Sequence, residues 1–461
     1  MSAADRCAVT VIGAGLTGPL LALLLARRGF EVILIERRPD PRTSTAAGGR
    51  SINLALSARG IRPLERAGVF TEVMPLLLPM RGRMVHELSG APALHRYGQR
   101  PEEINYSIGR AALNRVLVDA AERAGVTLRF EQRCIGFDPA TQTARCVEER
   151  SGREFTLECD TLIAADGAGS PLRASLVAAG VCEVSVEPLD HDYKEMTLPA
   201  GPNGLHALAP EALHIWPRGG FMLIALPNPD GTFTLTLFLP RTGQVSFAEL
   251  QDANARRRFF AEQFPDLIAH HATLLEDFRR NSQGQLATVR ARGWHLDGRV
   301  LLLGDAAHAI VPFHGQGMNA GFEDCALLDA LLERYRDWAV LYAEFERLRR
   351  PNTDAIAQMA LENYLEMRER VRDPGFQRLK QLAFELEQRF PKQFIPRYSM
   401  VMFHPEISYL EALRRGRIQA SILEQLDRRR APDGSIDPLI AEALLSASLP
   451  RVEPHPDPQT G

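Results

Sequence analysis

The sequence predicts an α/β fold with a Rossmann-like dinucleotide-binding domain, an antiparallel β-sheet domain and a helical C-terminal region. Three observations support this prediction. Residues 9–36 read as strand, glycine-rich turn, helix and strand, residues 181–241 read as short apolar strands, and the chain beyond Gln316 has helical spacing. The dinucleotide-binding domain is expected to consist of residues 1–75, 100–180 and 285–350. The β-sheet domain is expected to consist of residues 76–99 and 181–284, and the helical region of residues 351–461.

The first of these observations is a glycine-rich turn between two apolar strands. Gly13 allows the tight turn, Gly15 lets the backbone approach a pyrophosphate, and Gly18 lets the helix pack closely on the strand. The helix that follows offers N–H groups and a positive dipole end to phosphates. Glu36 lies 18 residues past Gly18, at the end of the second strand, where it can accept hydrogen bonds from a ribose. The unit predicts a dinucleotide site.

Composition narrows the class of protein. The 461 residues carry a net charge of −3, so nothing suggests a nucleic-acid partner. The six cysteines are scattered without a C-x-x-C pair, which disfavours a disulfide framework, a metal site or a dithiol redox centre. We therefore expect a reducing compartment, the cytoplasm. No apolar run approaches the roughly 18 residues that span a bilayer, so we expect no membrane anchor.

Further elements follow from periodicity and turn residues. A polar loop is expected over 37–50, a hairpin turn at 228–231 and a disordered tail from Pro450. Strands are expected over 81–86, 160–165 and 300–303, and helices over 57–67, 107–125, 247–278 and 376–390, with another helix that begins at Pro351.

Two more stretches join a buried strand to a turn that carries an acid: Ala165-Asp166-Gly167-Ala168-Gly169-Ser170 and Gly304-Asp305-Ala306-Ala307-His308. Together with the glycine-rich unit, they resemble the single-component flavin-dependent aromatic hydroxylases. The resemblance implies FAD as cofactor and NADPH as co-substrate, with Asp166 near both and Asp305 on the ribityl chain. It also implies that the helix opened by Gly317 presents N–H groups to the flavin.

Within this family, the resemblance is greatest to members that hydroxylate kynurenine. It is carried by the stretches 49–57, 80–86, 311–319, 360–364 and 394–400. Carried over to matching positions, it implies substrate contacts at Arg83, Tyr97, Asn363 and Tyr398. It implies flavin contacts at Leu16, Glu36, Arg38, Ala55, Arg110, Asp166, Asp305, Met318 and Asn319.

The residue types suit this substrate. The kynurenine carboxylate needs a planar bidentate cation, which Arg83 can be, and Tyr97, Tyr398 and Asn363 can add polar contacts. Alone, Arg83 would read as a surface charge, and the other three as buried polar groups. An apolar slot for the ring is expected from Met222, Ile224, Phe238, Pro312, Phe313 and Met367. His314 and Gln316 are expected to hold positions, since the chemistry needs no catalytic side chain.

The expected reaction is the 3-hydroxylation of L-kynurenine with NADPH and O2. Three alternatives stay open at this point: a flavin hydroxylase of another amino- or hydroxy-aromatic acid, a flavin reductase that transfers no oxygen, and a flavoprotein that serves as a redox-sensing interaction module. The oligomeric state is also left open, with a homodimer as one option.

Overall fold

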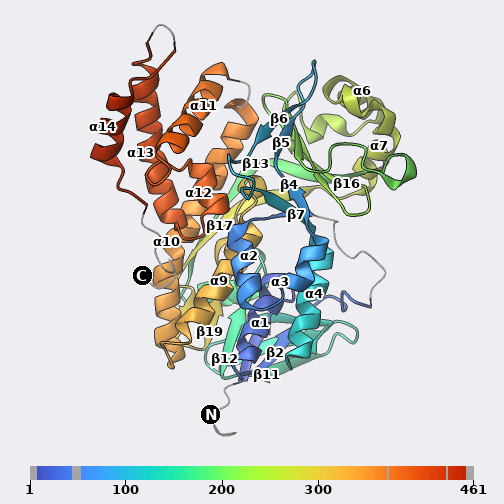
Figure 1. Cartoon of the computed structure of the whole chain (residues 1–461). Coiled ribbons are helices and arrows are strands. Elements are labelled where there is room, and N and C mark those ends of the chain that lie inside the picture. Colours follow the sequence, from blue (N-terminus) through green and yellow to red (C-terminus); the bar gives the residue numbers. More distant parts are fainter. Residues whose placement is uncertain (1–7, 44–52, 371–372, 432–433, 453–461) are drawn as a thin grey trace.

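The computed structural model describes residues 8–43, 53–370, 373–431 and 434–452. The expected loop beyond residue 43 and the tail beyond residue 452 therefore lie outside the described residues. Figure 1 shows the glycine-rich unit in the lower half, the large sheet at the upper right and the C-terminal helices at the upper left. This is the expected α/β arrangement of a nucleotide-binding half, an antiparallel sheet and a helical region.

The nucleotide-binding half is built on a mainly parallel sheet. Its strand order is β18-β19-β12-β1-β2-β8, and the five strands from β19 to β8 run parallel. In chain order this is the 3-2-1-4-5 sequence of a doubly wound sheet. The central strands β1, β12 and β19 are buried and rich in Val, Ile and Leu, as expected for a sheet covered on both faces. Their bounds are Ala8–Ile12 (β1), Glu31–Ile35 (β2), Thr127–Arg129 (β8), Thr161–Ala164 (β12), His295–Leu296 (β18) and Val300–Leu302 (β19).

Helices and two smaller sheets complete this half. Helix α1 packs against α4 and α9, and α2 packs against α9. The helices are α1 (Thr17–Arg27), α2 (Ala58–Arg66), α3 (Phe70–Val73), α4 (Arg110–Arg123), α5 (Pro171–Ala178), α8 (Asp305–His308) and α9 (Gly317–Leu331). The smaller sheets have the orders β11-β10-β9 and β3-β7-β4, with bounds Glu154–Glu158, Thr143–Glu148, Gln132–Asp138, Asn53–Leu56, Asn105–Gly109 and Leu78–Met80.

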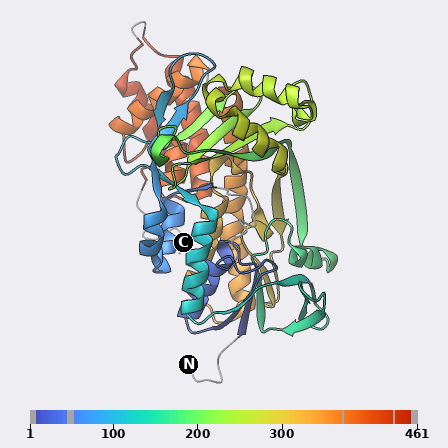
Figure 2. The same cartoon turned by 90° about the vertical axis from the view of Figure 1, so that its right-hand side faces the viewer.

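The large sheet has the order β17-β13-β16-β15-β14-β5-β6. Its strands are antiparallel except that β14 and β5 run parallel. One face carries Leu223, Leu235 and Leu237, which pack on α6 (Ala253–Gln263) and α7 (His271–Arg280). The strands are Gly284–Arg292 (β17), Glu183–Leu198 (β13), Phe233–Pro240 (β16), Met222–Pro227 (β15), Leu213–Pro217 (β14), Gly82–Val85 (β5) and Ala93–Arg96 (β6). Figure 2 shows the long strand β13 running between the two halves.

Two features of the large sheet bear on the predictions. The turn at 228–231 is confirmed as a hairpin, since Asn228 N donates to Thr232 O at 2.8 Å and Gly231 has a φ of +84°. Strand β17 pairs along its length with β13. The boundary predicted at residue 285 therefore falls inside a strand of the large sheet.

The C-terminal region consists of packed helices, shown in orange and red in Figure 1. They are α10 (Trp338–Leu365), the π-helical turn η7 (Glu366–Arg370), α11 (Pro374–Arg389), α12 (Arg397–Phe403), α13 (Tyr409–Asp427) and α14 (Pro438–Ser448). Helix α10 packs against α13, and α12 packs against both α13 and α2. Among the described residues, no helix combines the length and apolar character needed to cross a membrane.

Two of the predicted helices were wrong at their beginnings. The helix expected to begin at Pro351 begins at Trp338, and the side chain of the preceding residue, Asp337, accepts hydrogen bonds from Ala339 N and Val340 N. Buried residues on both sides of Pro351 hold the helix continuous, so packing outweighs the helix-breaking tendency of proline. The helix expected from Ser107 begins at Arg110, because residues 105–109 pair with β3 and β4 as strand β7.

Candidate active site

The glycine-rich turn has the geometry that the spacing predicted. Gly13 has a φ of +102°, and a Cβ there would lie 2.4 Å from the Ala165 carbonyl oxygen. A Cβ on Gly18 would lie 1.9 Å from the Gly13 oxygen, so helix and turn approach closely only because this residue is glycine. A Cβ on Gly15 would meet no atom within 4 Å. The turn is thus tight on one side and leaves room for a ligand on the other.

Glu36 lies at the end of β2 with its carboxylate turned toward this glycine turn. Oε2 accepts a hydrogen bond from Ala14 N at 2.8 Å, and Oε1 accepts one from Arg38 N at 3.0 Å. The Arg38 side chain forms an ion pair with the same carboxylate at 3.3 Å. A carboxylate has about four acceptor positions. Glu36 can therefore accept further bonds from a ribose while it fixes the turn.

A cavity of about 540 Å³, here called the first cavity, opens beside Gly15. It extends from the glycine turn across the N-terminus of α9 to the large sheet. Predicted cofactor residues that line it are Gly15, Leu16, Ala55, Arg110, Asp305, Gly317 and Met318. Predicted substrate residues that line it are Arg83, Tyr97, Tyr398, Met222, Ile224, Phe238, Pro312, Phe313 and Met367. The structure therefore brings most members of both predicted groups to the same cavity. The predicted cofactor and substrate residues that do not line it are Gly13, Gly18, Glu36, Arg38, Asp166, Asn319 and Asn363.

The polar end of the first cavity is formed by Arg83, Tyr97 and Tyr398. The guanidinium of Arg83 lies 5.0 Å from the centroid of the Tyr398 ring and 5.9 Å from that of Tyr97, within cation–π range. The two tyrosine rings stack at 5.5 Å, and burial raises the pKa of both phenols, which keeps them neutral donors. No carboxylate of the described residues forms an ion pair with Arg83.

The apolar end is formed by the second face of the large sheet and the segment after α8. Met222 pairs in register with Phe238, and the Phe238 ring lies 4.9 Å from the ring of Phe313. Phe313 belongs to the turn η6 (Pro312–His314) and also packs on Tyr364 at 4.3 Å. These side chains form a buried cluster with Met367. The result is an aromatic slot beside the charged end.

Four predicted residues make contacts within the protein, and of these only His314 also lines the first cavity. Asn319 donates to Ala55 O at 2.9 Å and accepts from Ser57 N at 3.1 Å, so its side chain fixes β3 to α9. Gln316 accepts from Tyr409 Oη at 2.7 Å. The remaining two are His314, whose ring stacks on Tyr398 at 5.4 Å, and Asn363, which donates to Phe313 O at 2.6 Å and lines a second cavity.

Burial determines the protonation of two groups near the site. It lowers the pKa of the His314 imidazole to about 3, so this ring is neutral and stays so in the ordinary pH range. Burial raises the pKa of Asp166 to about 6, although Ser170 Oγ donates to Oδ2 at 2.8 Å. Oδ1 of Asp166 has no hydrogen-bond partner. Asp305, in contrast, is exposed at the cavity where α8 begins.

Several polar residues of the first cavity were missed from the sequence: Asn105, Tyr193, Glu195 and Gln285. Asn105 donates to Tyr398 Oη at 3.4 Å and so touches the polar end directly. Tyr193 and Glu195 lie two residues apart on β13, which places both on the same face of the strand. Strand alternation over 183–198 could have identified them, whereas Gln285 lay in a segment that was not recognised as a strand.

The fold and the site together define a dinucleotide-binding enzyme with a small-molecule cavity at the cofactor. Comparisons with known proteins define this class of enzyme further. The family described as "FAD binding domain" matches residues 6–360. Among solved structures, the tetrameric form of 2-methyl-3-hydroxypyridine-5-carboxylic acid oxygenase superposes with a TM-score of 0.65 at 20% identity, covering 80% of this chain and 95% of the other. Pseudomonas aeruginosa PqsL, solved with 2-aminobenzoylacetate, gives 0.63 at 22% identity, with 81% and 99% covered.

Curated relatives are much more similar in sequence. A protein named kynurenine 3-monooxygenase from Xanthomonas axonopodis pv. citri (strain 306) is 47% identical over 449 residues, covering 97% of this chain and 98% of the relative. Another of that name from Stenotrophomonas maltophilia (strain K279a) is 46% identical over 445 residues, with 96% and 98% covered. This chain therefore belongs to the FAD-dependent monooxygenase family that includes these kynurenine 3-monooxygenases. The predicted family, enzyme class and FAD cofactor are confirmed.

Proposed function

We propose that this protein hydroxylates L-kynurenine to 3-hydroxy-L-kynurenine with NADPH and O2. The observation that carries the proposal is the polar end of the first cavity, where Arg83 lies against two neutral tyrosines without a carboxylate partner among the described residues. A cation held in this way suits the carboxylate of an amino acid. The aromatic slot beside it suits the aminophenyl ketone, and the names of the relatives point to the same substrate.

The residues of the nucleotide-binding half fit FAD. The space over Gly15 suits a pyrophosphate, Glu36 and Arg38 lie where a ribose is expected, and Asp305 offers an exposed carboxylate to ribityl hydroxyls. Arg110, Met318 and the backbone after Gly317 lie further along the cavity. When bound, FAD would take a hydride from NADPH and activate O2 for transfer of one oxygen atom to an electron-rich ring. We assign the FAD-binding domain to the segments that carry these residues.

The remaining groups orient the substrate and keep water out. Arg83 would hold the carboxylate, with the Tyr97 and Tyr398 hydroxyls as further donors. Phe238, Phe313 and their neighbours would fix the ring in a dry slot, where its own amino group activates the adjacent carbon, position 3. His314 is neutral and stacked on Tyr398, so we assign it a positional role, as we do for Gln316. We propose a cytoplasmic location, which fits the unpaired cysteines of the described residues.

The test is anaerobic reduction of the bound flavin by NADPH, with and without kynurenine, followed by product identification after O2 is admitted. We expect kynurenine to accelerate reduction and 3-hydroxykynurenine to form in proportion to NADPH consumed. A panel of other amino- and hydroxy-aromatic acids, run in parallel, separates this substrate from its chemical neighbours. NADPH oxidation without oxygen transfer to kynurenine would refute the proposal.

A further inference from the structure

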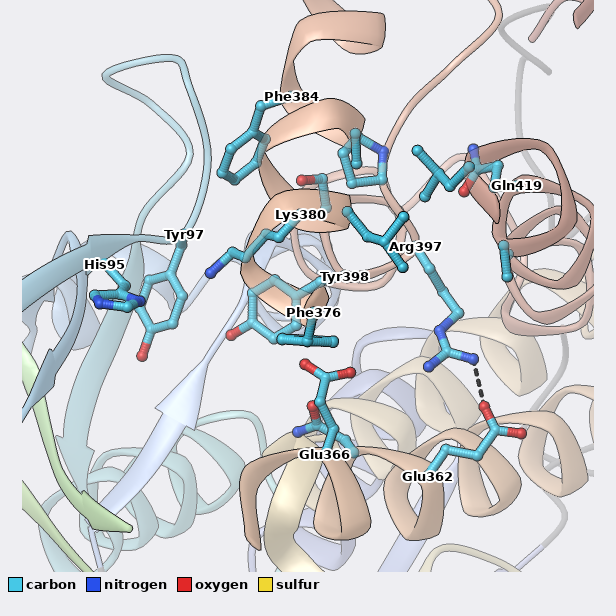
Figure 3. A pocket seen from close by; sticks show the side chains of 18 of the residues that line it. His95, Tyr97, Glu362, Glu366, Phe376, Lys380, Phe384, Arg397, Tyr398 and Gln419 are labelled. Atoms are coloured by element: carbon cyan, nitrogen blue, oxygen red, sulfur yellow. Dashed lines mark hydrogen bonds and ion pairs between the residues drawn. The ribbon is translucent and has the colours of Figure 1, made fainter. Parts of the chain in front are cut away.

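A second cavity of about 490 Å³ (Figure 3) adjoins the polar end of the first cavity, the group of Arg83, Tyr97 and Tyr398 that is here called the clamp. It is formed mainly by the C-terminal helices α10 to α13 and by strands β5 and β6. The residues that line both cavities are Arg83, Tyr97, His314 and Tyr398. The clamp is therefore the wall between the two cavities, and either side can present a ligand to it.

The second cavity contains a cation and a carboxylate that come from different elements. Lys380 extends from α11 toward Tyr97 and Tyr398, and Glu366 extends from η7 toward the same space (Figure 3). Among the described residues, Lys380 has no ion-pair partner, and its Nζ lies 5.9 Å from the centroid of the Phe384 ring. Arg397 and Glu362, which also line the cavity, are already joined to each other by an ion pair. Lys380 and Glu366 thus remain available to a ligand.

Aromatic and aliphatic side chains form a large part of the remaining wall. They are Phe376, Phe384, Phe394, Leu379 and Leu423. Figure 3 shows the Phe376 ring close to Tyr398 and the Phe384 ring above Lys380. A cavity with an ammonium group, a carboxylate and aromatic rings matches each part of an aromatic amino acid: its carboxylate, its ammonium and its ring.

We infer that the second cavity is an antechamber that binds the aromatic amino-acid substrate on its way to the first cavity, with Lys380 on its carboxylate and Glu366 on its ammonium group. The inference rests on the proposed function, because it takes the same substrate. The carboxylate then passes from Lys380 to Arg83, which both cavities share. The ring cannot react in the antechamber, since Gly15, Asp305 and Met318 line only the first cavity.

The electrostatics of Lys380 support this role. Burial and, to a lesser extent, the positive charge of Arg83 lower its pKa to about 8, against the opposing effect of the Glu366 carboxylate. His95 of β6 faces the same group, and burial together with Lys380 and Arg83 lowers the pKa of that imidazole. The two nearby cations repel each other in a desolvated wall. A bound carboxylate relieves this repulsion, so the cavity attracts anions.

The test is steady-state and stopped-flow kinetics of the FAD-loaded full chain with Lys380→Met, which keeps the length and loses the charge. We expect kcat/KM for kynurenine to fall about tenfold through KM and through a slower binding step, since a charge-assisted contact is lost. The value of kcat and the yield of product per NADPH should be unchanged. Glu366→Gln should act in the same direction, and Lys380→Arg should restore most of the loss.

The matched control is Lys392→Met, because Lys392 is an exposed lysine outside both cavities. An unchanged kcat/KM in Lys380→Met would overturn the proposal that the second cavity is an antechamber. A loss of kcat or of product yield would also overturn it, because Lys380 would then act at the reacting position. Flavin content and thermal unfolding show whether each variant folds. Should Lys380→Met unfold, an unchanged kcat/KM in Glu366→Gln overturns the inference. A wild-type chain that leaves kynurenine unhydroxylated would instead refute the proposed function.

Discussion

Replacement of Arg83 by alanine should separate substrate binding from folding in this protein. In most proteins, removal of a buried arginine strands a carboxylate and destabilises the fold. Arg83 has no such partner among the described residues, since its neighbours in the wall are the rings of Tyr97 and Tyr398. We therefore expect Arg83→Ala to leave the folded, flavin-loaded protein intact while it weakens kynurenine binding.

The magnitude follows from the contact that is lost. A hydrogen-bonded contact to a charged group contributes about 1.5–3 kcal/mol, which corresponds to about 10- to 150-fold in Kd. The assay is titration of the flavin absorbance with kynurenine, with the same measurement on Arg83→Lys. Lysine keeps the charge but loses the planar fork and the stacking on Tyr398, so we expect an intermediate Kd. A near-normal Kd in Arg83→Ala would refute the clamp.

Three further predictions concern the scaffold. Arg59→Ala should lower the free energy of unfolding by about 3–5 kcal/mol in urea titrations, because it breaks a buried ion pair with Glu323. The control variant Arg62→Ala, at an exposed position of the same helix, should leave the free energy of unfolding unchanged, and equal stability of the two variants would contradict the prediction. Glu36→Ala should purify with less flavin, and a full flavin content would count against its ribose contact. The His314 imidazole is protonated below about pH 6.5 in the unfolded chain but only near pH 3 in the folded protein. Its contribution to the free energy of unfolding is therefore fully present above pH 6.5 and is lost as the pH falls toward 3. His314→Gln should flatten that slope by up to about 1.4 kcal/mol per pH unit in thermal unfolding at pH 4–8, and an unchanged slope would show that other groups cause it.

The nucleotide-binding unit could be predicted closely because its signals are local. The positive φ of Gly13 and the close approach at Gly18 are demands that glycine alone meets, so the spacing predicts the turn directly. The errors occurred where long-range pairing decides. Residues 107–109 were predicted as the start of a helix but pair with strands β3 and β4, and Pro351 lies inside a helix that packing keeps continuous.

The site was predicted less completely for the same reason. Arg83 and Tyr398 are more than 300 positions apart, and only the resemblance to a family brought them together before the structure did. Asn105, which reaches Tyr398, had no motif of its own. The second cavity could not be anticipated either, because Lys380 and Glu366 lie on segments whose relative placement depends on tertiary packing.

Polar contacts fix helix α12, which carries Tyr398 of the clamp, to the nucleotide-binding half. Arg59 of α2 donates to the carbonyl oxygens of Val401 at 2.7 Å and Met400 at 3.1 Å, which belong to the same helix as Tyr398. Gln316, just before the α9 N-terminus that faces the first cavity, accepts from Tyr409. Because the same contacts place Tyr398 and the start of α9, a variant that loosens α12 should raise KM and weaken flavin binding together. We therefore expect the clamp and the cofactor cavity to respond together to such a variant.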